Sequence, residues 1–261
     1  MKIAVPVKFV PDLIEELTID PSGATLDTTW LRLIINEFDD YAVEQAVILK
    51  ERDGGQVTVM AMDAEGVDDF LFTSAAKGAD QLIKLTGDPS AGSGQVFSSV
   101  NNHALSRAYA ELVKELSPDL ILTGVQAHND LDGSVGPLMA EVLGFPYVGY
   151  VAGITTSGDK IVARKEYSGG LVAEVEVKLP AVLGIQTSEQ PPRYIAYSKI
   201  RQMMGTAKIE ERPVASLDMN GGPAVSRMFQ PEVAERATMI EGSADEVADK
   251  LVGIFKELGV M

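Results

Sequence analysis

The chain has 261 residues, 46% of them hydrophobic, and 38 acidic residues outnumber 22 basic ones, which gives a formal charge of −16. This length and composition are typical of one large globular core with or without an appendage. The negative charge disfavours a phosphate backbone or an anionic bilayer as the main partner, so we expect neither nucleic-acid binding nor membrane insertion. With no cysteine and two histidines, disulfides and thiolate metal sites are excluded and no metal site is expected.

Strands and helices alternate along the first half of the chain. Short apolar or β-branched runs indicate buried strands, and apolar residues at every third or fourth position indicate helices. In chain order we expect a strand at 1–8, a helix from about 36 to 53, a strand at 56–62, a helix at 67–77, a strand at 81–85, a helix from about 96 to 116 and a strand at 119–124. A series of this kind predicts a doubly wound α/β fold with a mostly parallel sheet and helices on both faces.

The pattern changes in the second half. Residues 160–165 and 171–178 alternate around Ser168-Gly169-Gly170, which predicts an antiparallel hairpin attached to the sheet. From Pro191 the periodicity is lost until a final helix at about 244–258. We therefore predict an α/β domain over 1–190 and, over 191–261, an extended arm and C-terminal helix that pack on another chain. No apolar run approaches ~20 residues, and the short N-terminal run favours a strand over a signal segment, so a cytoplasmic location is expected.

The strongest functional signal follows the fourth strand, where a polar loop from Gly124 leads to Gly133-Ser134 at the start of a helix. Ligands of open α/β sheets bind beyond the carboxyl ends of the strands, and a helix N-terminus offers free N–H groups to an anion. The loop residues Asn129, Asp130 and Asp132 are suited to ribose or adenine contacts. The alternative interpretation is an ordinary Gly-Ser helix cap.

Other candidates are weaker. His128 beside two aspartates is more typical of a solvated loop than of a metal site, and no acid–base or nucleophile constellation is present, so the residues give no support to an enzyme with its own substrate. The segment from Arg193 to Arg212 contains five basic residues and two acidic ones. This segment either docks an acidic partner or folds back on its own domain.

Eight short segments, in order, resemble the β subunit of electron transfer flavoprotein. They are Val7-Lys8, Asn36 to Asp40, Ala75 to Asp80, Thr123 to Gln126, Gly169 to Leu171, Leu179 to Val182, Pro192 to Tyr194 and Arg236 to Gly242. The resemblance implies the adenine nucleotide hydrolase-like variant of the Rossmann fold. It also implies a heterodimer with an α subunit, which holds most of the FAD, and an AMP buried in the β subunit.

The resemblance also implies site residues. The expected AMP contacts are Pro6, Asn36, Glu37, Phe38, Asp39, Met62, Gly124, Gln126, Asn129, Asp130, Gly133, Ser134 and Val135. Leu13 and Phe38 are expected near the FAD, and Glu166, Tyr194, Tyr197, Lys199 and Arg201 are expected to dock a flavin dehydrogenase that donates electrons for a downstream oxidoreductase acceptor.

Two other functions stay open. In flavin-bifurcating relatives the β-subunit site holds a second, redox-active FAD; the loop Asn129 to Ser134 differs from the Asp-Gly-Asp-Thr that is usual there, which favours AMP. The second alternative is a stand-alone adenine-nucleotide-binding protein of the universal-stress type, which would be a homodimer without FAD.

Overall fold

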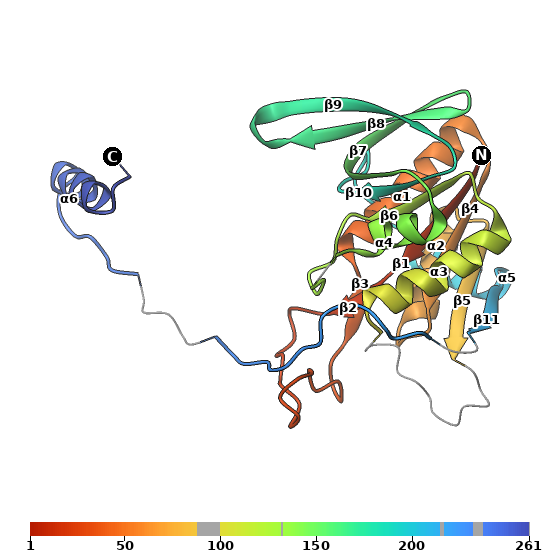
Figure 1. Ribbon diagram of the computed structural model, residues 1–261, viewed down its shortest axis with the longest axis horizontal. Coiled ribbons are helices and arrows are strands. Elements are labelled where there is room, and N and C mark those ends of the chain that lie inside the picture. The colour runs from red at the N-terminus through yellow and green to blue at the C-terminus, as the bar shows by residue number, and fades with distance from the viewer. Residues whose placement is uncertain (88–99, 132, 215–216, 232–236, 261) are drawn as a thin grey trace. The chain divides into compact units, whose positions relative to one another are not determined.

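The computed structural model describes every residue except 88–99, 132, 215–216, 232–236 and 261. The chain forms two compact units, Met1–Ser226 and Arg227–Met261. The first unit is built on a nine-stranded sheet in the order β11-β5-β4-β1-β6-β10-β7-β8-β9 (Figure 1). A separate two-stranded sheet pairs β2 (Phe9–Pro11) with β3 (Leu33–Ile35) in antiparallel fashion.

Seven neighbouring strands of the large sheet are parallel. They are β11 (Ile209–Val214), β5 (Gln81–Gly87), β4 (Gln56–Met62), β1 (Lys2–Val7), β6 (Leu120–Gly124), β10 (Ala181–Ile185) and β7 (Tyr147–Ser157). Every residue of β6 and β10 is buried. Strands covered on both faces must be apolar on both faces, which explains their unbroken hydrophobic runs.

Helices cover both faces of this sheet. On one face α1 (Glu37–Asp53) and α2 (Val67–Lys77) enclose a core that includes Leu49 and Leu71. On the other face α3 (Asn102–Leu116) and α4 (Val135–Leu143) enclose a second core around Tyr109 and Met139. The predicted doubly wound α/β fold is therefore confirmed.

The remaining two strands extend the sheet as an antiparallel hairpin. β8 (Lys160–Tyr167) pairs with β7 and with β9 (Leu171–Lys178). A single 3-10 turn, η3 (Ser168–Gly170), joins them, and Gly169 and Gly170 have φ angles of 80° and 77°. Glycine suits this turn because side chains disfavour positive φ. The predicted hairpin is confirmed.

Two expectations need correction. The helix expected from about 96 begins, among the described residues, at Asn102, because the Asn101 side chain accepts a hydrogen bond from the N–H of Ala104 and caps it there; 96–99 lie outside the described residues. Between residue 191 and the final helix, where the loss of periodicity had predicted an extended arm, the structure contains a helix and a strand. Helix α5 (Tyr197–Thr206) packs on α2, and β11 joins the sheet edge beside β5. Residues 191–226 thus lie in the first unit, where we had expected the arm.

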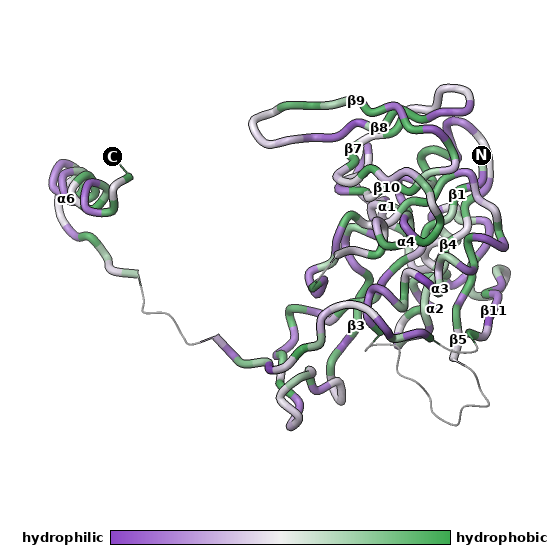
Figure 2. The backbone as a smooth tube through the Cα atoms, in the orientation of Figure 1, coloured by the Kyte–Doolittle hydropathy of each residue, from purple (hydrophilic) through white to green (hydrophobic). Residues whose placement is uncertain are grey.

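Among its described residues, the second unit contains one helix, α6 (Ala244–Glu257). Ser243 and Glu246 form a capping box, in which each side chain accepts a hydrogen bond from the other residue's N–H. Hydrophobic and hydrophilic residues are mixed along α6 (Figure 2), and no residue of the helix is buried within the described chain. Among the described residues no helix is both long enough and apolar enough to cross a membrane.

Candidate functional site

The crevice lies where the sheet reverses its winding. Strand β1 has β4 on one side and β6 on the other, and the helices that lead into these two neighbours, α1 into β4 and α3 into β6, cover opposite faces of the sheet. In open α/β sheets the loops that follow such strands separate and leave a crevice at their carboxyl ends. Two adjoining hollows occupy this position, and Val7, Lys8 and Tyr109 line both.

Asp39 holds three elements together at the crevice. It lies in the first turn of α1, and its carboxylate accepts hydrogen bonds from the N–H of Gly124 (2.6 Å), the N–H of Lys8 (2.8 Å) and Nδ2 of Asn36 (3.2 Å). Burial raises the pKa of Asp39 to about 6, against the opposing effect of these donors. The side chain therefore ties the ends of β1 and β6 to α1.

Gly124 is a position where only glycine fits this arrangement. A Cβ there would lie 2.7 Å from Oδ1 of Asp39 and 2.8 Å from Cβ of Phe38. The close approach lets the start of α1 sit directly over the end of β6.

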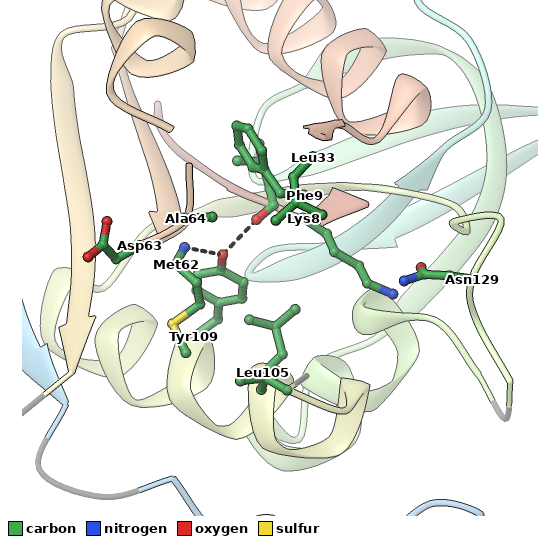
Figure 3. A pocket seen from close by; sticks show the side chains of 11 residues that line it. Lys8, Phe9, Leu33, Met62, Asp63, Ala64, Leu105, Tyr109 and Asn129 are labelled. Atoms are coloured by element: carbon green, nitrogen blue, oxygen red, sulfur yellow. Dashed lines mark hydrogen bonds between the residues drawn. The ribbon is translucent and has the colours of Figure 1, made fainter. Parts of the chain in front are cut away.

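A second polar cluster closes the loop after β6. Nζ of Lys8 lies 2.8 Å from Oδ1 of Asp130, and both side chains are only 12% exposed. Asp130 also accepts hydrogen bonds from the N–H of Ala127 (2.8 Å) and Nδ2 of Asn102 (2.7 Å), and Nδ2 of Asn102 also donates to the carbonyl of Gly133 (2.8 Å). Asp130 therefore holds the loop in place, and the ammonium group of Lys8 compensates its negative charge. Figure 3 shows the Lys8 side chain reaching across the hollow toward the amide of Asn129.

Tyr109 lies at the bottom of the crevice and comes from α3, on the face of the sheet opposite to α1. Its hydroxyl donates to the carbonyl of Val7 (2.6 Å) and accepts from the N–H of Met62 (3.0 Å), as Figure 3 shows. Full burial raises the pKa of the phenol well above its ordinary value, so it stays protonated. It joins the end of β1 to the end of β4.

The N-terminus of α4 borders the second hollow. Ser134 is the N-cap residue, and it lines the hollow together with Val135. The nearby Thr123 hydroxyl, 1% exposed, has no hydrogen-bond partner among the described residues, and a Cβ on Gly136 would lie 2.5 Å from it. Free N–H groups at a helix N-terminus suit an anionic ligand, whereas the Thr123 hydroxyl lies against α4 and lines neither hollow.

The structure brings most of the expected nucleotide contacts together. Lining the two hollows are Pro6, Asn36, Asp39, Met62, Gly124, Gln126, Asn129, Ser134 and Val135. Glu37, Phe38, Asp130 and Gly133 lie beside this group without lining it; Gly133 has a φ of 120° and open space around it. Asp132 lies outside the described residues.

Three polar residues of the crevice were missed by the reasoning from sequence. Lys8 follows β1 directly, so the rule that ligands bind beyond the carboxyl ends of the strands could have identified it. Tyr109 and Asn102 belong to a helix on the far face, and their contacts depend on tertiary packing that no local pattern reveals.

Leu13 and the expected docking residues do not line this crevice, whereas Phe38, the other residue expected near the flavin, lies beside it. Leu13 is exposed in the turn after β2. Tyr194, Tyr197, Lys199 and Arg201 are exposed at and before α5, and Glu166, on the β8–β9 hairpin, pairs with Arg164 (3.4 Å). Within the described chain no group of His, Asp and Glu side chains is arranged to hold a metal ion.

The fold and its crevice define a doubly wound α/β protein with a ligand-type cleft at the switch point of the sheet. The electron transfer flavoprotein domain matches residues 25–217. Over 98% of both chains, the sequence is 34% identical to the electron transfer flavoprotein subunit beta of Methylophilus methylotrophus and 33% identical to that of Clostridium acetobutylicum. It is 31% identical, also over 98% of both chains, to the Caffeyl-CoA reductase-Etf complex subunit CarD of Acetobacterium woodii. The chain therefore belongs to the electron transfer flavoprotein family, and its general role is electron transfer.

Proposed function

We propose that this chain is the β-type subunit of a heterodimeric electron transfer flavoprotein. It binds AMP in the switch-point crevice, helps an α subunit enclose FAD, and accepts electrons from a flavin dehydrogenase for a downstream acceptor. The observation that carries the proposal is the crevice itself, bordered by the N-terminus of α4, in a chain of this family.

The residues that border the crevice fit a nucleoside monophosphate. The start of α4 offers hydrogen-bond donors to a phosphate, and the dipole of α4 favours negative charge there. The amides of Asn36, Gln126 and Asn129 supply donors and acceptors for the sugar and the base. Because the carboxylates of Asp39 and Asp130 are already hydrogen-bonded, their repulsion of a phosphate is reduced.

The same arrangement argues for a structural rather than a reacting nucleotide. Asp39, Lys8 and Asp130 are engaged with the protein's own groups, and none is left as a general base in the crevice. A ligand that binds only the folded chain stabilises it. FAD, when bound in the heterodimer, supplies the redox chemistry, and this chain contributes Leu13 and Phe38 near it together with the docking residues Glu166, Tyr194, Tyr197, Lys199 and Arg201.

Nucleotide analysis of the purified heterodimer tests the proposal. The chain is co-expressed with its α partner, denatured, and the released nucleotides are separated and quantified. We expect equal amounts of AMP and FAD. Two FAD molecules and no AMP would replace our assignment by the bifurcating alternative, and the absence of both would refute the proposal.

A variant of Gly133 locates the binding site. Gly133→Leu puts a side chain into a backbone of φ 120°, which must shift and carry the start of α4 with it. AMP content should fall by at least about ten-fold, since the donors at a helix N-terminus depend on its position, and FAD content should stay. Gly158→Leu is the matched control, because Gly158 also has positive φ (63°) and open space but lies in the β7–β8 turn. Equal AMP content in both variants would contradict the site assignment.

The universal-stress alternative receives no support, because the family match covers most of the chain. The C-terminal helix gives a separate reason to expect a partner: Leu251, Ile254 and Phe255 are exposed on one helix. Apolar side chains at this spacing are typical of a helix that packs on another surface. We assign that surface to the α subunit. The cytoplasmic location stays a prediction.

A further inference from the structure

Residues 188–193, here called the tether, are fastened to the side of α1. Gln45 donates to Oε1 of Glu189 (2.9 Å) and accepts from the N–H of Glu189 (2.9 Å). Arg52 lies 3.3 Å from Oε1 of the same carboxylate. The tether leads from β10 to the exposed segment that begins at Tyr194.

Arg193 makes the strongest attachment. Its Nε donates to Oε1 of Glu44 (2.7 Å), and its Nη1 and Nη2 donate to the two oxygens of Glu51 (2.6 and 2.9 Å). Its backbone N–H donates to Oε2 of Glu44 (3.0 Å). The planar guanidinium thus spans two carboxylates spaced two helical turns apart on α1, a geometry that only arginine provides.

The contact between Arg193 and Glu44 is buried on the Glu44 side. Its side chain is 2% exposed, and its two oxygens are both used by Arg193. A buried carboxylate is costly unless it is paired and hydrogen-bonded, so the native packing of α1 requires Arg193 in this position. Glu51 is exposed and contributes the outer half of the fork.

The segment beyond Arg193 has much less support. Tyr194 is 92% exposed and Tyr197 is 69% exposed. Helix α5 has no buried residue among those described, and it packs on α2. The conformation of residues 194–201 therefore depends on where Arg193 fixes the chain.

We propose that Arg193 is a positioning residue, whose guanidinium fixes the start of segment 194–201 so that its two tyrosines and two cations are presented to an acidic, partly apolar face of the flavin dehydrogenase. This inference rests on the docking role given to that segment in the proposed function. An ordered segment loses less conformational entropy on binding than a loose one. Arg193 therefore acts on the binding of the dehydrogenase and leaves electron transfer in the docked complex unchanged.

Limited proteolysis of the heterodimer tests the anchoring without any partner enzyme. Trypsin cleaves after Lys199 and Arg201, and chymotrypsin cleaves after Tyr194 and Tyr197. In Arg193→Gln we expect cleavage in this segment to become at least about five-fold faster, because local opening exposes it to the protease. Arg193→Lys should lie between that variant and the wild type, since an ammonium keeps the charge but cannot span both carboxylates. Lys160→Gln removes one cation from an exposed pair with Glu176 and should leave the rate unchanged.

Reduction kinetics test the positioning role. With the flavin dehydrogenase that reduces the wild-type heterodimer as probe, Arg193→Gln should raise KM at least about five-fold, as expected if only a fifth of the molecules hold the docking conformation. The limiting rate and the FAD content should stay within about two-fold, since neither depends on that population. Glu51→Gln should raise KM in the same direction and keeps the buried partner Glu44, so it serves if Arg193→Gln fails to fold.

The outcomes separate this inference from the proposed function. Tyr197→Ala raises KM if segment 194–201 docks the dehydrogenase at all. If Tyr197→Ala raises KM while Arg193→Gln and Glu51→Gln do not, the positioning role is wrong and docking stands. If none of the three changes KM, the docking role itself is wrong. A fall in FAD content or in limiting rate without a change of KM would reduce Arg193 to a structural residue and overturn the inference.

Discussion

The ionisation of Asp39 links the crevice to the stability of the fold. Its carboxylate is 4% exposed and accepts three hydrogen bonds, two of them from backbone N–H groups. The donors favour the charged form, burial favours the neutral form, and burial dominates, which raises the pKa from 3.8 to about 6. The folded chain therefore binds this proton more tightly than the unfolded chain does.

The raised pKa sets the direction of the pH dependence. Between the unfolded pKa of 3.8 and the folded value of about 6, the folded state holds more protons, so the free energy of unfolding falls as pH rises. The 2.2-unit difference between these two values corresponds to about 3 kcal/mol, at roughly 1.4 kcal/mol per unit. This contribution is present below the unfolded pKa and is lost above the folded pKa.

Comparison with Asp39→Asn isolates that contribution. The free energy of unfolding of the full-length chain is measured by urea denaturation, followed by circular dichroism, for both proteins between about pH 3.5 and pH 7.5. Other carboxylates cancel in the difference, wild type minus variant. We expect the difference to fall by about 3 kcal/mol across the window and to be flat above pH 7.

Asp27 provides a control of opposite sign. Hydrogen bonds from Thr29 lower its pKa at an exposed turn, so the same comparison with Asp27→Asn should give a difference that rises slightly with pH. A difference for Asp39→Asn that rises with pH would show that the three donors outweigh burial. A flat difference would show that the two effects cancel. Either result would refute the reasoning.

Two further predictions concern other parts of the chain. Gly124→Ala should lower the free energy of unfolding by about 2 kcal/mol or more, because the new Cβ would lie 2.7–2.8 Å from atoms of Asp39 and Phe38. Urea denaturation measures this, with Gly253→Ala in α6 as the unhindered control, and equal stability of Gly124→Ala and the wild type would contradict the close packing of α1 on β6. Phe255→Asp should abolish co-purification with the α partner and leave the unfolding of the first unit unchanged, because it places a charge on the exposed apolar side of α6. Size-exclusion chromatography measures this, with Lys256→Asp as the control, and an intact heterodimer would show that α6 does not contact the partner.

The sequence predicted the centre of the sheet well, because the central strands are covered on both faces and read as unbroken apolar runs. It failed at the edge of the sheet. Strand β11 contains Glu210, Glu211 and Arg212, and an edge strand tolerates such charges because one side has no neighbouring strand. The residues alone gave no reason to expect a strand there.

The site was predicted in part for a similar reason. The Gly133-Ser134 helix start is a local signal, and the structure has Ser134 as the N-cap residue of α4. Asp39 was expected only as a nucleotide contact, yet it is buried and joins β1 to β6. Its partners at Lys8 and Gly124 are distant in sequence, and only the assembled sheet brings them together.

Tyr109 has a consequence for how this crevice is kept open. Val7 is the last residue of β1 that pairs with β4, opposite Ala61, and the two strands diverge beyond it. Where the strands part, the carbonyl of Val7 and the N–H of Met62 lose the hydrogen-bond partners that strand pairing would give them. A buried backbone group without a partner lowers the stability of the fold. One phenolic oxygen satisfies the two groups at once. A phenylalanine would fill the same volume and leave both groups unsatisfied, so it is the phenolic oxygen of Tyr109, rather than its aromatic ring, that lets the two strands part here.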